Sequence, residues 1–177
     1  MKKNNLQLII FFFLVSGIIF SQETDQINVE NFAKKISNTI NVDKSQLFFI
    51  SKESKKPDNF KESQENDLGV VNFVKNNSWV SCKNLTPIDQ NCKISSITNK
   101  NIEDKLQEPN VFDGMVIKTL NSSKSELSFE SGKTYAILLF SFKLSSFINY
   151  GDYLAKLKKL EKEFGIPYIV IASDYVD

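Results

Sequence analysis

The sequence predicts an α/β protein that ends in a parallel strand–helix–strand unit. Two apolar runs, Tyr135–Phe140 and Tyr168–Ala172, are typical of buried strands. Between them, apolar residues recur at helical spacing from Tyr150 to Phe164, before the helix-stopping pair Gly165 and Pro167. Two parallel strands joined by a helix form a right-handed crossover. The preceding residues favour an α+β arrangement of one helix and short strands.

The N-terminus has the organisation of a secretory signal peptide. Lys2 and Lys3 precede an apolar run of 15 residues, Leu6–Phe20. This run is shorter than the roughly 20 apolar residues that a membrane-spanning helix needs. We expect cleavage after Ser21, with Gly17 as a second candidate, and export to the periplasm or the medium without a stable membrane span. An uncleaved anchor is the alternative.

Composition argues against several classes of function. The chain contains no histidine, and all 22 of its basic residues are lysine. Nucleophile pairs that use an imidazole base and mixed Cys/His zinc sites are therefore excluded. Nucleic-acid binding is not expected, because arginine is the side chain best suited to bidentate phosphate and base contacts. We expect no catalytic residue, no metal and no cofactor.

Residues 22–108 form the predicted N-terminal part, between the signal peptide (1–21) and the C-terminal unit (109–177). Helical spacing predicts one helix over Val29–Ile40, with Asn41 as its stop. A solvated loop is expected over the charged residues 51–67. The remaining predicted elements are a strand over Leu47–Ile50, a hairpin of strands 70–74 and 78–82, a strand over 93–97 and a short helix over 101–107.

Cys82 and Cys92, the chain's two cysteines, are expected to form a structural disulfide. In an oxidising compartment an isolated even pair is usually a bridge. Closing this short loop should add roughly 2.7 kcal/mol to stability by the chain-entropy estimate. The alternative is a reversible redox couple. However, the sequence between the two cysteines predicts a loop and no helix N-terminus that would lower a thiol pKa.

The C-terminal part, residues 109–177, begins with strands expected over Met115–Ile117 and Leu127–Phe129. A turn at Gly132-Lys133-Thr134 then leads into the strand Tyr135–Phe140. These three residues resemble the end of a phosphate-binding loop, but Leu127 stands where that motif needs glycine, and a strand follows where it needs a helix. We therefore interpret them as a turn that completes a hairpin.

The segment from Asp113-Gly114 through Gly132-Lys133 to Phe140, and on to Tyr168–Asp174, resembles exported thioredoxin-like thiol-disulfide oxidoreductases and their peroxiredoxin relatives. The likeness lies in the order of hydrophobic elements and covers under half of the mature chain. It implies a partial thioredoxin-like unit: a β-hairpin, a central strand, an active-site turn, a long helix and a parallel strand. It also implies that the family's cis-proline strand and its partner would lie beyond Asp177.

Neither cysteine of the family's active-site turn is present, because Ser145, Ser146, Phe147 and Ile148 occupy that position. A serine hydroxyl without a base has no disulfide-exchange chemistry. A serine nucleophile assisted by carboxylates is a conceivable catalytic arrangement, with Ser145 or Ser146 as the nucleophile and Asp152 and Asp174 as the carboxylates. The simpler interpretation is that serine and aspartate before a helix cap its free N–H groups.

We therefore expect an exported, non-catalytic binding or scaffold protein with a degenerate thioredoxin-like unit. Its protein partner would pair with an exposed sheet edge, either at Tyr168–Ala172 or at the hairpin Leu127–Phe140. The alternative is a thiol-disulfide redox protein that uses Cys82 and Cys92.

Overall fold

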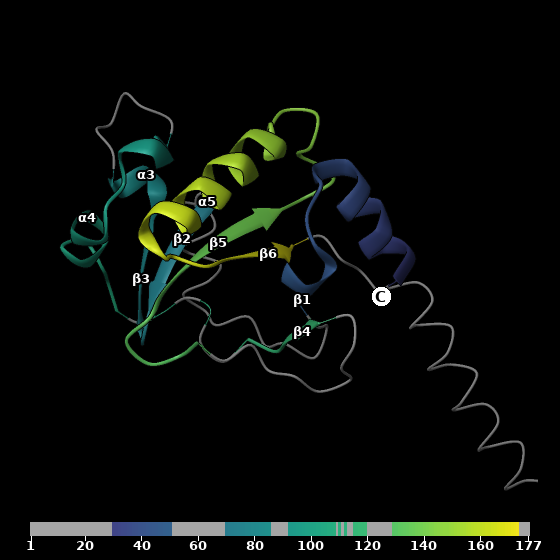
Figure 1. The fold of residues 1–177 in the computed structure, drawn as a ribbon. Coiled ribbons are helices and arrows are strands. Elements are labelled where there is room, and N and C mark those ends of the chain that lie inside the picture. Colours follow the sequence, from purple (N-terminus) through teal and green to yellow (C-terminus); the bar gives the residue numbers. More distant parts are fainter. Residues whose placement is uncertain are drawn as a thin grey trace, which may run out of the picture.

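The computed structural model of the chain describes residues 30–50, 70–85, 92–108, 110, 112, 115–119 and 129–173. Within these ranges the chain forms a six-stranded mixed sheet with helices on one face (Figure 1). The strands are β1 (Leu47–Ile50), β2 (Val71–Lys75), β3 (Ser78–Ser81), β4 (Ile117–Thr119), β5 (Thr134–Phe140) and β6 (Tyr168–Ala172). The helices are one over residues 30–40, α3 (Cys82–Leu85), α4 (Asn99–Glu103) and α5 (Tyr150–Phe164), with 3-10 turns η1 (Lys44–Gln46) and η2 (Ile94–Ser96).

The strand order is β3-β2-β5-β6-β1-β4, so a parallel centre is flanked by antiparallel strands. Strand β6 lies parallel to both β5 and β1, with Leu138 of β5 and Leu47 of β1 opposite Val170. The predicted parallel unit β5-α5-β6 is therefore confirmed. Strands β2 and β4 run antiparallel to β5 and β1, respectively.

Both faces of the central strands are buried, as the continuous apolar runs predict. On β5, Ala136, Leu138 and Phe140 belong to the larger apolar cluster, whereas Ile137 belongs to a second cluster. This alternation follows the period of two of a β-strand. Strand β6 repeats the pattern, with Val170 in the larger cluster and Ile171 in the second.

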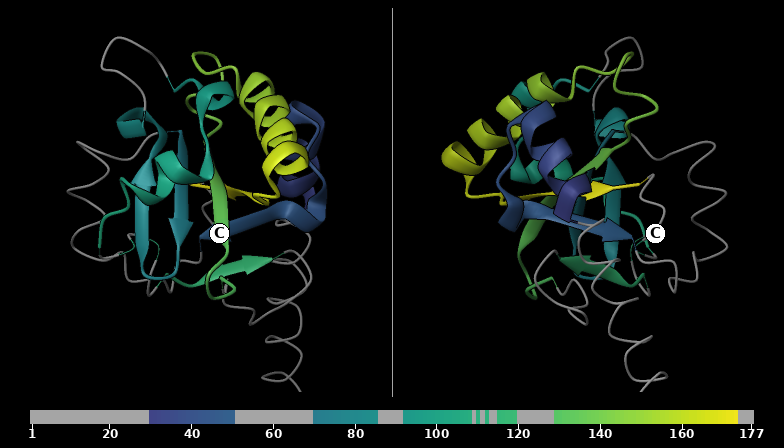
Figure 2. Two further views of the ribbon diagram at one scale, coloured as in Figure 1. Left: turned by 60° about the vertical axis from the view of Figure 1, so that its left-hand side comes forward. Right: turned by 90° about the vertical axis from the view of Figure 1, so that its right-hand side faces the viewer.

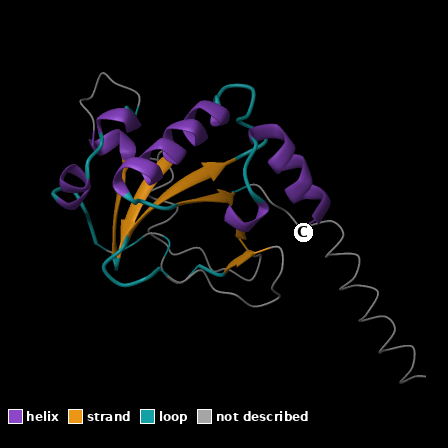
Figure 3. Cartoon of the chain, viewed as in Figure 1, coloured by secondary structure: helices purple, strands orange, loops and turns teal. Residues whose placement is uncertain are grey.

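The larger cluster is covered by the described helices. Ile36 of the 30–40 helix, Ile94 of η2, Ile102 of α4 and Leu157 of α5 are all buried in it. Figure 3 shows these helices gathered on one side of the strands, and the turned views of Figure 2 agree. The second cluster is completed by non-helical residues, Phe112 and Met115, with Phe129 packed against it.

Helix α5 has the bounds that the sequence predicts, because its two ends carry strong signals. Asn149 caps the first turn, its side chain accepting a hydrogen bond from Asp152 N at 3.2 Å. Gly165 ends the helix in the left-handed conformation, with φ 65°, before Pro167. Asn41 ends the 30–40 helix in the same way, with φ 54°.

The predicted hairpin is confirmed as β2 and β3, and it is fastened to neighbouring segments. Its turn residue Asn76 has φ 53°, and its Oδ1 accepts a hydrogen bond of 2.7 Å from Gly132 N, just before β5. Lys75 forms an ion pair of 2.5 Å with Glu103 of α4. On the outer side of β3, Trp79 exchanges two backbone hydrogen bonds of 2.8 Å with Gln107.

Several local predictions are wrong. Residues 93–97 hold the 3-10 turn η2, because Ile94 and Ile97 both point into the core at a spacing of three. The short helix is α4 over Asn99–Glu103, shifted toward the N-terminus of the predicted 101–107. The strand predicted over Met115–Ile117 is β4, which begins at Ile117.

The predicted hairpin of Leu127–Phe140 is also wrong, because β5 is hydrogen-bonded on its two sides to β2 and β6. Phe129 lies outside any strand, and residues 127 and 128 lie outside the described residues. Neither β5 nor β6 is an edge strand, so the two sheet edges suggested for a partner are occupied. In the described sheet the outermost strands are β3 and β4. Strands from the 22–108 and 109–177 parts share this one sheet.

The two glycines at the ends of α5 provide a matched test of this helix. Gly165→Ala should lower the free energy of unfolding by about 1 kcal/mol, since an L-residue is strained at positive φ. Gly151→Ala should instead raise it, by up to about 1 kcal/mol, because the added methyl meets only Asn149 Oδ1 at 3.6 Å. Urea denaturation measures both. Equal effects of one sign would contradict the assigned helix end.

Candidate functional site

The loop between β5 and α5, residues 141–149, leaves the sheet at the carboxyl end of its parallel strands, where open α/β sheets place ligands. It contains all four residues that the thioredoxin-like resemblance predicts as a degenerate active-site turn, Ser145, Ser146, Phe147 and Ile148. Among the described residues, Phe147 is the most exposed large apolar side chain, at 84%, and Leu144 is 48% exposed. Ile148 is half-buried and packs against the core.

Local hydrogen bonds give this loop a compact turn. The backbone N–H groups of Phe147 and Ile148 both donate to Leu144 O at 2.9 Å. Ser145 donates to Phe142 O twice, from its N–H at 3.2 Å and from its hydroxyl at 2.7 Å. The exposed Phe147 is therefore held by backbone bonds on a defined turn.

Aromatic contacts attach the start of the loop to the core. The buried Tyr150 hydroxyl accepts a hydrogen bond of 3.1 Å from Ser141 N. The Phe142 ring contacts Phe140 at 4.9 Å and Phe32 of the 30–40 helix at 5.2 Å, both edge to face. Above the same ring, Lys35 Nζ lies 4.7 Å from the centroid. The loop is thus joined to α5 and to the 30–40 helix.

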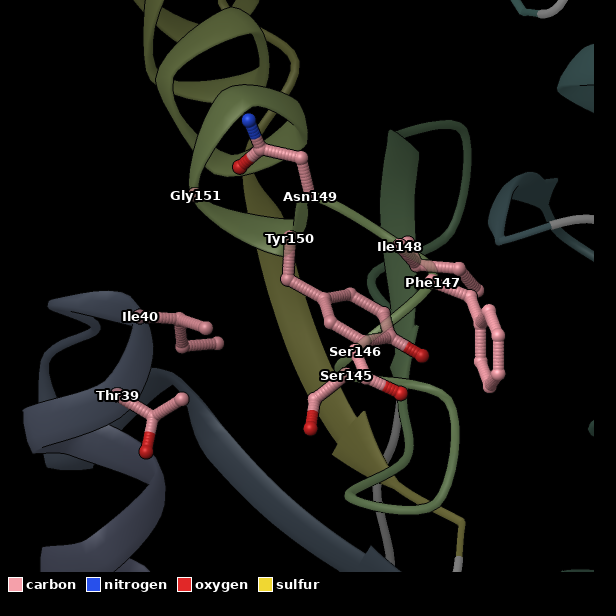
Figure 4. Close-up of a pocket in the computed structure, with 9 residues that line it drawn as sticks. All are labelled: Thr39, Ile40, Ser145, Ser146, Phe147, Ile148, Asn149, Tyr150 and Gly151. Carbon is pink, nitrogen blue, oxygen red and sulfur yellow. The ribbon is translucent and has the colours of Figure 1, made fainter.

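A hollow of about 410 Å³ lies between this loop and the 30–40 helix (Figure 4). Thr39 and Ile40 line one side, and Figure 4 shows Phe147 on the far side from them. The remaining lining residues are Ser145, Ser146, Ile148, Asn149, Tyr150 and Gly151. An adjoining hollow of about 290 Å³ continues between the helices to Lys158, whose Nζ donates to Asn41 O at 3.1 Å.

The arrangement offers hydrogen-bonding groups and no nucleophile with a base. Ser145 donates its hydroxyl proton to a backbone carbonyl, and the Asp152 carboxylate pairs with Lys156 Nζ at 2.6 Å. Asp174 lies outside the described residues. The prediction that serine and aspartate cap this helix names the wrong residues, because Asn149 caps α5 and Asp152 lies in its first turn. In the described ranges no group of three His, Cys, Asp or Glu side chains is placed to hold a metal ion.

The disulfide between Cys82 and Cys92 is confirmed, with Cα atoms 5.3 Å apart. It fastens the end of β3 to the segment that leads into η2, which packs against α5. Contrary to prediction, a helix does begin at Cys82, but α3 is a single turn and Cys82 is only 1% exposed. Burial keeps this sulfur from an incoming thiolate.

Among the described residues, two groups with a shifted pKa, Tyr168 and Asp43, lie at the opposite end of the strands. Burial raises the pKa of Tyr168, the first residue of β6, whose hydroxyl donates to Gln46 Oε1 at 2.7 Å. Hydrogen bonds from Ser45 lower the pKa of Asp43. Neither group reaches the β5-α5 loop.

The hollow has further lining residues that were not among the site residues predicted from the sequence. Asn149 had a detectable signal, since Asn followed three residues later by Asp is typical of a helix start. Thr39 and Ile40 had none, because their place beside the loop depends on how the 30–40 helix packs in the folded chain.

No family model matches the chain, and searches of curated proteins and of solved structures find no match. In the described residues no helix has the length and apolar character to cross a membrane.

The Tyr150 hydroxyl should stabilise the loop. Tyr150→Phe leaves the buried N–H of Ser141 without this acceptor, so we expect the free energy of unfolding to fall by about 1 to 2 kcal/mol. Tyr153→Phe, at a half-buried position on the same helix, is the control and should change it by less than about 0.5 kcal/mol. Equal losses in urea denaturation would show that the hydroxyl of Tyr150 has no special role.

Proposed function

We propose that this chain is an exported, non-catalytic protein that binds a protein partner through its β5-α5 loop. The observation that carries the proposal is the 84% exposure of Phe147 on a hydrogen-bonded turn beside a hollow. A large aromatic side chain exposed to water gains free energy by burial in a partner, and phenylalanine is among the residues enriched in the buried core of protein interfaces.

The strand order supports the thioredoxin-like resemblance in one further respect. The family's cis-proline strand and its partner were expected beyond Asp177, yet the antiparallel pair β2 and β3 lies beside the central strand β5. This pair precedes β5 in the chain. We infer a thioredoxin-like sheet in which the antiparallel pair comes from an earlier part of the sequence.

The β5-α5 loop lacks the two cysteines that thiol-disulfide exchange would need at this position, which favours binding over catalysis. The turn that would carry two cysteines holds Ser145, Ser146, Phe147 and Ile148. Thiol-disulfide exchange requires a thiolate as attacking and leaving group, and serine provides neither. The signal-peptide pattern and the disulfide both favour an oxidising compartment outside the cytosol.

Binding of the partner should depend on Phe147. We expect the mature protein to capture a specific partner from an envelope or medium fraction of its own cells, and Phe147→Ser to reduce capture at least about tenfold. Phe164→Ser, at the other end of α5, removes a side chain that is 42% exposed and should leave capture unchanged. Equal effects of the two variants, measured by quantitative mass spectrometry, would contradict a site at this loop.

The alternative, a redox protein that uses Cys82 and Cys92, makes a separate prediction. Because Cys82 is buried, we expect insulin reduction driven by dithiothreitol to proceed at the buffer rate in the presence of the protein. Faster turnover by the wild type, lost in the Cys82→Ala/Cys92→Ala variant, would replace the binding proposal with the redox one.

A further inference from the structure

We propose that the β5-α5 loop and its hollow bind an acidic peptide segment of the partner protein, with an apolar side chain packed beside Phe147. The inference rests on the proposed function and names the chemistry of the partner. It follows from three observations, namely the local charge, the position of two lysines and the shape and lining of the hollow.

The first observation is a local excess of positive charge. The segments that flank the hollow, residues 30–41 and 141–158, contain five lysines against two acidic residues, a net charge of +3, whereas the whole chain has +1. Of these, Lys156 and Asp152 neutralise each other as an ion pair of 2.6 Å. Lys34, Lys35 and Lys158 then outnumber Glu30, the acidic residue that remains in these two segments.

The second observation is that two of these lysines are fixed beside the site. Lys35 Nζ lies over the ring of Phe142, the residue at the start of the loop. Lys158 Nζ donates to Asn41 O at the edge of the adjoining hollow. An ammonium group has three donors, and that bond uses one of those on Lys158. A carboxylate in the adjoining hollow would therefore meet Lys158, and one on a peptide that continues past the start of the loop would meet Lys35.

The third observation favours a peptide over an anionic membrane surface. The surface between the loop and the 30–40 helix is concave, and its lining residues Thr39, Ser145, Ser146 and Asn149 carry hydroxyl and amide groups. The Thr39 and Ser145 hydroxyls donate to backbone carbonyls of this chain and can still accept a hydrogen bond. These groups suit the N–H and C=O groups of an extended peptide, which must be hydrogen-bonded when buried. A bilayer presents a broad surface, whereas the exposed Phe147 lines a recess.

The test uses the mature protein and a fluorescein-labelled, glutamate-rich peptide with one central phenylalanine. The matched probe has glutamine in place of every glutamate. Fluorescence anisotropy should show tighter binding of the glutamate peptide, by about three- to tenfold for two exposed charge pairs. This preference should shrink in high salt.

Charge reversal assigns the effect to the site. Lys35→Glu/Lys158→Glu should remove the preference for the glutamate peptide, whereas Lys93→Glu/Lys100→Glu makes the same change in net charge near η2 and α4 and should preserve it. Phe147→Ser should weaken both peptides.

Three outcomes would overturn the inference. If the two peptides bind equally, the partner is not selected for its charge, and partner capture that depends on Phe147 would still support the proposed function. If neither peptide binds, the occupant is not a peptide of this kind. Sedimentation with phosphatidylglycerol vesicles that depends on Lys35 and Phe147, without peptide binding, would assign the surface to a membrane.

Discussion

Strand β5 is buried on both faces and hydrogen-bonded along both sides, and the arrangement of the other described elements follows from these requirements. Its apolar side chains must be packed against other residues on both faces of the sheet, and its backbone N–H and C=O groups need hydrogen-bond partners on the neighbouring strands. The helices meet the first requirement on one face, and Phe112, Met115 and Phe129 meet it on the other. Strands β2 and β6 supply the backbone partners. Each fully buried large aliphatic or aromatic side chain contributes about 1.5 to 3 kcal/mol, so the buried residues of β5 contribute strongly to the stability of the core.

The same arrangement explains why the candidate site lies at the end of β5. Since its sides and faces are occupied, the chain that continues past Phe140 must leave the sheet before it can reach α5. The bond from Ser141 N to Tyr150 and the packing of Phe142 fix this exit close to the core. The turn that follows is left outside, and Phe147 extends from it. The position of the exposed Phe147 thus depends on a central strand that is buried on both faces and paired on both sides.

Elements whose stability is local could be predicted from the sequence, and those that depend on distant contacts could not. The observed bounds of α5 and β6 match the predicted ones because the signals for them are local. The apolar residues recur at helical spacing up to Phe164, and Gly165 and Pro167 follow directly. The pairing of β2 with β5 joins segments about sixty residues apart, and no local pattern specifies it. Ile94 and Ile97 suit either a strand or a 3-10 turn, and the core decides between them. Of the candidate site, a loop was predictable from its place after a buried strand, but the hollow was not, because it lies between that loop and the distant 30–40 helix.

The strand order can be tested directly by backbone nuclear Overhauser effects in the labelled protein. Antiparallel pairing of β2 with β5 predicts cross-strand contacts between Phe73 and Ala136 and between Asn72 and Ile137. With these contacts present, both sides of β5 are occupied and Phe147 lies at the end of a closed central strand. Backbone contacts from Ala136 to residues 127 and 128 in their place would restore the local hairpin, open a side of the sheet and contradict the position assigned to the site.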